Sequence, residues 1–66
     1  MNKSTSRLIR IREVISLTGL SKSYLYQLSN SGHFPKPVKL VEGGTASAWL
    51  LSEVNDWIES RVADRK

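Results

Sequence analysis

Residues 19–30 restrict the fold more than any other part of the sequence, because they carry the signals for a turn followed directly by a helix. Gly19 can adopt the positive φ that ends a preceding helix. Ser21 is a favourable N-cap, since its hydroxyl can accept a hydrogen bond from an otherwise unpaired backbone N–H. Gly32 is a natural residue to follow a helix end. The sequence therefore predicts a tight turn and then a helix over about 22–31.

At 100° per residue, this predicted helix separates into two sides. The side expected to face the core consists of Tyr24, Leu25, Leu28 and Ser29. The other side has no carboxylate and consists of Lys22, Ser23, Tyr26, Gln27 and Asn30. Ammonium, hydroxyl and carboxamide groups can bond to phosphates and base edges, so this side is a candidate DNA-reading surface. The alternative interpretation is a solvated helix face without a partner.

The charges are distributed unevenly along the 66 residues. Residues 1–41 hold seven cations and one anion, for a net charge of +6, whereas residues 42–66 hold three cations and five anions, for −2. One basic end and one mildly acidic end favour a polyanionic partner on the basic side. Ordinary solubilising lysines and arginines are the alternative explanation.

Length and composition exclude several classes of protein. The chain has no cysteine and one histidine, so it offers no disulfide, no thiolate zinc site and no all-protein metal site. No apolar run approaches the roughly 20 residues of a membrane span. Residues 1–6 are expected to be a disordered basic tail and residues 7–64 a single domain. We expect a cytoplasmic protein that uses no cofactor and no small-molecule ligand.

The remaining segments predict a strand, helix, turn, helix, hairpin and helix in that order. Apolar spacing indicates a helix over 11–17. Residues 38–40 and 46–49 are expected to form a hairpin around a turn at 42–45, with Val38 and Leu40 pointing inward and Lys39 outward. Ser52 is expected to cap a last helix. The two tryptophans, Trp49 and Trp57, are expected to supply core volume rather than to stack on a ligand.

Several segments together resemble the AlpA-type phage regulators, a family related to the excisionases and to MerR-like winged-helix DNA-binding domains. The resemblance covers about residues 7–58. The segments that carry it are Arg7-Leu-Ile-Arg10, Glu13-Val14, Thr18-Gly-Leu-Ser-Lys-Ser23, Leu25-Tyr26, Gly32-His-Phe-Pro-Lys-Pro-Val-Lys-Leu40, Ala48-Trp49, and Ser52-Glu-Val54 with Trp57-Ile58. It implies a mainly α-helical fold with a small β-hairpin wing (β-α-turn-α-β-β-α) that binds double-stranded DNA and regulates a prophage or genomic island. Thr45 stands where the family often has a basic wing residue, and His33 where it often has lysine.

The helix over 22–31 is expected to enter the major groove. Ser23 and Gln27 are the expected base readers, whereas Lys22 and Tyr26 are expected to bond to phosphate and Asn30 to do either. Wing and backbone contacts are expected from Arg10, Arg12, Lys36, Lys39, Gly43, Gly44 and Thr45. The alternative for Arg10 and Arg12 is solvation or pairing with Glu13.

The leading hypothesis is a transcriptional regulator without enzymatic activity, since no catalytic arrangement of side chains is evident. One alternative is an excisionase that bends attachment-site DNA. Another is a protein-interaction module that has lost DNA binding. Because a domain this small contacts few base pairs, we expect a dimer or cooperative binding to adjacent sites on DNA. Integrase and RNA polymerase are open as protein partners.

Overall fold

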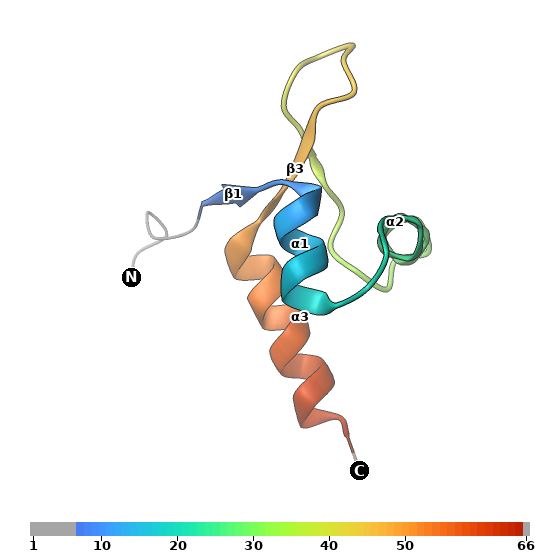
Figure 1. Ribbon diagram of the computed structural model, residues 1–66, viewed down its shortest axis with the longest axis vertical. Coiled ribbons are helices and arrows are strands. Elements are labelled where there is room, and N and C mark those ends of the chain that lie inside the picture. Colours follow the sequence, from blue (N-terminus) through green and yellow to red (C-terminus); the bar gives the residue numbers. More distant parts are fainter. Residues whose placement is uncertain (1–6, 66) are drawn as a thin grey trace.

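The computed structural model describes residues 7–65 as three helices and a small three-stranded antiparallel sheet (Figure 1). The expected basic tail, residues 1–6, lies outside the described residues. The order along the chain is β1 (Leu8–Ile9), α1 (Ile11–Thr18), α2 (Lys22–Asn30), β2 (Val38–Lys39), β3 (Ser47–Leu50) and α3 (Leu51–Ala63). This order of elements agrees with the one predicted from the sequence.

Strand β3 occupies the middle of the sheet, in the order β1-β3-β2. On one side it pairs with β1, where Ile9 is opposite Trp49, and on the other with β2, where Lys39 is opposite Ser47. The β2–β3 hairpin projects away from the helices, and α3 extends in the opposite direction (Figure 1). Helices α1 and α3 both pack on β3. The central strand therefore ties the hairpin to the helical part of the domain.

The turn between α1 and α2 forms as the sequence predicts. Gly19 has a φ of 75° and its backbone N–H donates to the Ile15 carbonyl, which closes α1. The Ser21 hydroxyl accepts a hydrogen bond from the Tyr24 backbone N–H at 3.2 Å, so Ser21 is the N-cap of α2. The predicted cap and helix end are both confirmed, and together they fix where α2 begins.

The hydrophobic core is small and centred on β3. Its buried members are Ile9, Val14, Leu25, Phe34, Trp49 and Val54. Trp49 is completely buried, and its ring meets Tyr26 edge-to-face at a centroid distance of 5.6 Å. Trp57 is half-buried and meets Phe34 edge-to-face at 4.9 Å. Both tryptophans therefore pack inside the domain, as the composition of so small a core requires.

Two local predictions about side chains, those for Val38 and Leu40, were wrong. Tyr24, expected to pack against the edge of the core, is 46% exposed, while the core side of α2 is centred on Leu25 and Ser29. Val38 and Leu40, expected to point inward, are each 40% exposed, since the projecting hairpin has no helix facing it. Each error comes from tertiary placement that local periodicity does not encode.

The predicted N-cap of the last helix was also wrong. Helix α3 begins at Leu51, with Leu50 as a cap residue that makes no side-chain cap bond, so Ser52 lies inside the first turn. The cause is strand pairing that continues to the helix start, because the Leu51 backbone N–H donates to the Arg7 carbonyl at 2.8 Å. Pairing between β1 and β3 decides where the chain turns into α3.

Candidate nucleic-acid interface

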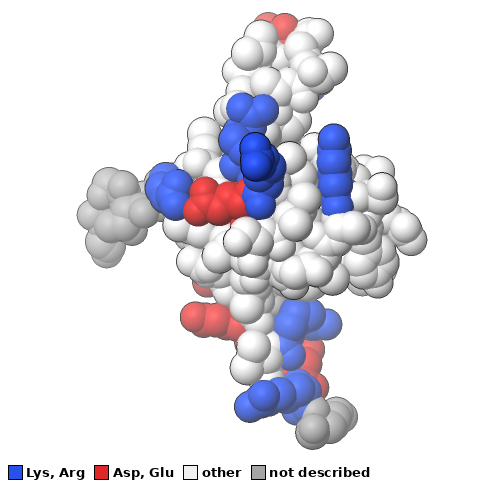
Figure 2. Space-filling model, viewed as in Figure 1, with Lys and Arg blue, Asp and Glu red and all other residues white. Residues whose placement is uncertain are grey.

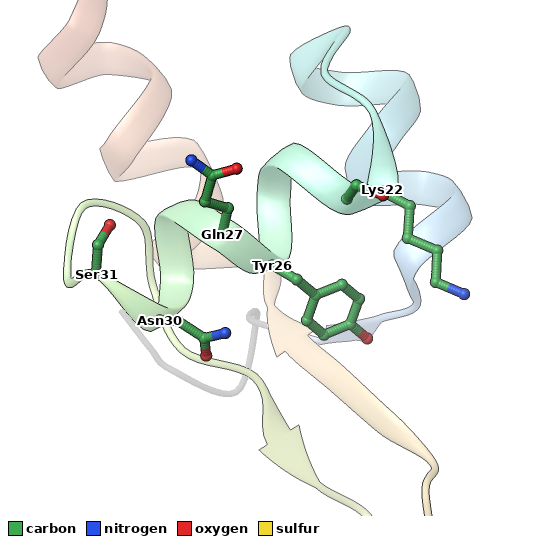
Figure 3. A pocket seen from close by; sticks show the side chains of 6 residues that line it. Lys22, Tyr26, Gln27, Asn30 and Ser31 are labelled. Atoms are coloured by element: carbon green, nitrogen blue, oxygen red, sulfur yellow. The ribbon is translucent and has the colours of Figure 1, made fainter.

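The exposed side of α2 forms a shallow open depression on the surface. Its lining residues are Lys22, Ser23, Tyr26, Gln27, Asn30 and Ser31. In Figure 3, Tyr26 and Asn30 project from one side of α2 and Gln27 from the other, and the Lys22 side chain extends away from the helix start. The structure thus brings together all five residues of α2 that the sequence singled out for DNA contact. It adds Ser31, which follows the helix.

Tyr26 differs from the other lining residues because part of its side chain is fixed. It is half-buried, and its ring contacts Trp49 of β3. A side chain already held in place loses little rotamer freedom when it binds. Tyr26 therefore links the depression on α2 to the core, whereas Lys22, Ser23 and Gln27 are exposed.

Basic residues surround the start of both α1 and α2. Arg10 is the N-cap residue of α1 and makes no side-chain cap bond, Arg12 lies in the first turn of α1, and Lys22 is the first residue of α2. A cation at a helix N-terminus opposes the helix dipole, at a cost of about 0.3–1 kcal/mol. An anion bound at these positions would offset that cost, which favours a phosphate-bearing partner.

These cations are free to bind an external anion. Within residues 7–65 the salt bridges are Arg7 with Glu13 and Arg61 with Asp64, both at 2.7 Å. The partner of Glu13 is therefore Arg7, so the alternative that Glu13 pairs with Arg10 or Arg12 was wrong. In the described part of the chain, the cations that form no salt bridge include Arg10, Arg12, Lys22 and Lys39.

Figure 2 shows where the charged residues lie on one face of the molecule. Lysines and arginines gather across its middle, around α1, α2 and the base of the β2–β3 hairpin. An acidic side chain also lies among them, paired with Arg7, while acidic and basic groups are mixed along α3 and the hairpin tip is acidic. A polyanion is attracted most strongly to the middle of this face, where basic groups predominate, and is repelled at the hairpin tip.

The hairpin offers less to a phosphate than the sequence predicts. The Gly43 φ of 79° suits the third position of a tight turn, and the Gly44 backbone N–H donates to the Val41 carbonyl at 3.0 Å. The Gly44 amide, expected as a phosphate donor, is thus already used to close the turn. Gly43 and Thr45 are exposed at the tip, beside Glu42.

Lys36 has acidic neighbours. It lines a second depression together with Pro35, Trp57 and the carboxylate-bearing Glu53 and Asp56 of α3. Two anions nearby lower the attraction of this place for phosphate. Lys39 is therefore the better candidate for a phosphate contact from the hairpin, because Lys36 lies beside acidic residues of α3.

In a comparison with known protein families, residues 7–62 match the family model described as the prophage CP4-57 regulatory protein (AlpA). The chain belongs to the AlpA family of phage regulatory proteins. Two relatives with similar sequences were found. The uncharacterized protein ORF88 of Enterobacteria phage P4 is 48% identical over 60 residues, which cover 91% of this chain and 66% of that protein. The DNA-binding transcriptional activator AlpA of Escherichia coli (strain K12) is 29% identical over 66 residues, with 91% of each chain covered.

The chain spans just under two thirds of the length of the phage P4 relative and nearly the whole of Escherichia coli AlpA. The family assignment covers α1, α2, the hairpin and nearly all of α3. Among the described residues, no helix is both long enough and apolar enough to cross a membrane.

Proposed function

We propose that this AlpA-family chain is a winged helix-turn-helix protein that binds double-stranded DNA, with α2 in the major groove. The observation that carries the proposal is the depression along α2, which has six hydroxyl, carboxamide, phenol and ammonium side chains and no carboxylate. The neighbouring cations Arg10, Arg12 and Lys22 support it, since they form no salt bridge within the described residues. A polar helix face that has cations but no carboxylate suits both base edges and phosphates.

Base reading is assigned to two exposed side chains of α2. Gln27 can bond adenine N6 and N7 in a bidentate pair, and Ser23 can donate to or accept from a neighbouring base. Lys22 and Tyr26 bond to phosphate and fix the register of the helix on the duplex. Asn30, at the end of α2, extends either set of contacts.

The β2–β3 hairpin is the wing of this proposed MerR-like arrangement. Lys39 at its base is exposed and makes the phosphate contact. The tip, with Val41 at 58% exposure and Glu42, is too acidic and apolar to bind the backbone tightly. We therefore place the main contact on α2 and the helix starts, with a secondary contact at the base of the wing.

Regulation is the biological role that fits this binding mode. The similarity to the Escherichia coli transcriptional activator AlpA favours control of transcription, without enzymatic activity, over the architectural role of an excisionase. The contact area of one small domain supports only modest sequence specificity, so cooperative binding to adjacent sites on DNA is part of the proposal.

Salt dependence tests the electrostatic part of the proposal. If Arg10, Arg12, Lys22 and Lys39 neutralise about four phosphates, log K falls with log salt at a slope of about −3.6. Between 50 and 200 mM salt, affinity for a random duplex is then expected to fall about 150-fold. The measurement is fluorescence anisotropy of a labelled duplex. A slope near zero would contradict phosphate binding and would favour a protein-interaction module.

A further inference from the structure

The connector between α2 and β2, residues 31–37, lies outside every helix and strand, yet it is firmly held. Phe34 in its middle is 4% exposed and belongs to the core. The carbonyl of His33 accepts a hydrogen bond from the Trp57 indole N–H at 2.7 Å. The His33 backbone N–H in turn donates to the Leu28 carbonyl of α2 at 2.8 Å. Side chains from other elements therefore determine the path of this connector.

Within this connector, the carbonyl oxygen of Pro35 accepts two hydrogen bonds at once. The Ser29 hydroxyl of α2 donates to it at 2.9 Å, and the Trp49 indole N–H of β3 donates to it at 2.9 Å. A carbonyl oxygen has two lone pairs, so both are used. We call Ser29, Pro35 and Trp49 the Pro35 clamp. The clamp joins α2, the connector and β3 at one oxygen atom.

Ser29 has no other evident reason to be polar. Its side chain is 1% exposed, and alanine at the same helix position would have a higher helix propensity and no hydroxyl to desolvate. The hydroxyl lies on the core side of α2, away from the depression that we propose for DNA. Its contribution is therefore the bond to Pro35.

We propose that the Pro35 clamp sets the angle between α2 and the β2–β3 hairpin, and that Ser29 is thereby a positioning residue for DNA binding. This inference rests on the proposed function. Contacts from two surfaces add to affinity only when both reach the duplex in one rigid arrangement. Without the Ser29 hydrogen bond, we expect α2 to bind the duplex still, while the hairpin no longer contacts the duplex at the same time.

A double-mutant cycle between Ser29→Ala and Lys39→Ala tests this coupling. In the wild-type background, Lys39→Ala is expected to weaken binding to a random duplex about fivefold, through the loss of one phosphate contact. In the Ser29→Ala background, Lys39→Ala is expected to change affinity less than about twofold, since Lys39 is then already disengaged. Equal effects of Lys39→Ala in both backgrounds would overturn the clamp and leave the proposed function standing.

The free protein provides a test that needs no DNA. Residual dipolar couplings of the backbone amides report how α2 is oriented relative to β3. In the wild type, the couplings of both elements are expected to fit a single rigid orientation, whereas in Ser29→Ala each element is expected to need its own. Ser29→Cys replaces the hydroxyl with a somewhat larger thiol that donates only weakly, so it is expected to behave like Ser29→Ala and serves if the alanine variant fails to fold. A single unchanged orientation in a folded variant would overturn the clamp. Failure of the wild type to bind any duplex would instead refute the proposed function and, with it, the role of Ser29 in DNA binding.

Discussion

Replacing Trp49 with alanine is expected to leave most of the chain unfolded at 25 °C. Trp49 is completely buried at the centre of the sheet, contacts Tyr26 and donates to the Pro35 carbonyl. Truncation of a buried tryptophan costs about 3–5 kcal/mol. A domain of this length has a total free energy of unfolding of about 3–7 kcal/mol. The stability lost on truncation is therefore comparable to the total stability of the domain.

Circular dichroism during urea and thermal unfolding measures this effect. Tyr24→Ala is the matched control, since it truncates an aromatic side chain that is 46% exposed. It is expected to cost less than about 1 kcal/mol, as is usual for surface substitutions. A Trp49→Ala variant that unfolds at the wild-type midpoint would show that β3 is not the centre of the core.

Reversing the charge of Lys22 is expected to weaken DNA binding about tenfold or more at 0.1 M salt. Lys22 is exposed at the start of α2, lines the depression and makes no salt bridge in the described part of the chain. The release of one counterion contributes about 0.9 log units of affinity at this salt concentration. Lys22→Glu removes that contribution and adds repulsion from the phosphate, without disturbing a buried contact.

Arg65→Glu is the control with the same change in net charge. Arg65 is exposed beyond the end of α3, far along the chain from the depression. Anisotropy titrations of both variants are expected to show a much smaller loss for Arg65→Glu and a salt slope that is shallower by about 1 for Lys22→Glu. Equal losses for the two variants would indicate attraction to the total charge rather than a defined contact at α2.

The start of α2 could be predicted from sequence because local chemistry determines it. Gly19 ends α1 with a positive φ, and the Ser21 hydroxyl caps α2 through an adjacent backbone N–H. Neither interaction involves residues distant in the chain. The polar side of α2 was found for a related reason, since helix geometry alone places Lys22, Ser23 and Gln27 on one side.

What the sequence did not reveal depends on contacts between distant segments. Tyr26 is half-buried and Tyr24 exposed because Trp49 lies against one flank of α2, which helical periodicity cannot indicate. Ser52 fails to cap α3 because pairing between β1 and β3 continues to Leu51. The bonds of the Pro35 clamp are also long-range, since Trp49 follows Pro35 by 14 residues.

Within the candidate site, the helix residues were easier to predict than the hairpin residues. Lys36 is close in sequence to Lys39, but its neighbours in the structure include Glu53 and Asp56 of α3. The sequence predicts the Gly44 amide as a phosphate donor, but in the structure this amide donates to the Val41 carbonyl within the turn. A hairpin's contacts depend on its turn geometry and on what lies behind it, and composition specifies neither.

The most direct test of the account is a nuclear magnetic resonance titration of labelled protein with duplex DNA at low and moderate salt. Chemical shift changes are expected at α2, at the start of α1 and at Lys39, with little change along the acidic side of α3. These shifts should weaken as salt rises. Shifts centred on α3, or no shifts at low salt, would contradict the claim that α2 and its neighbouring cations form a DNA-binding surface.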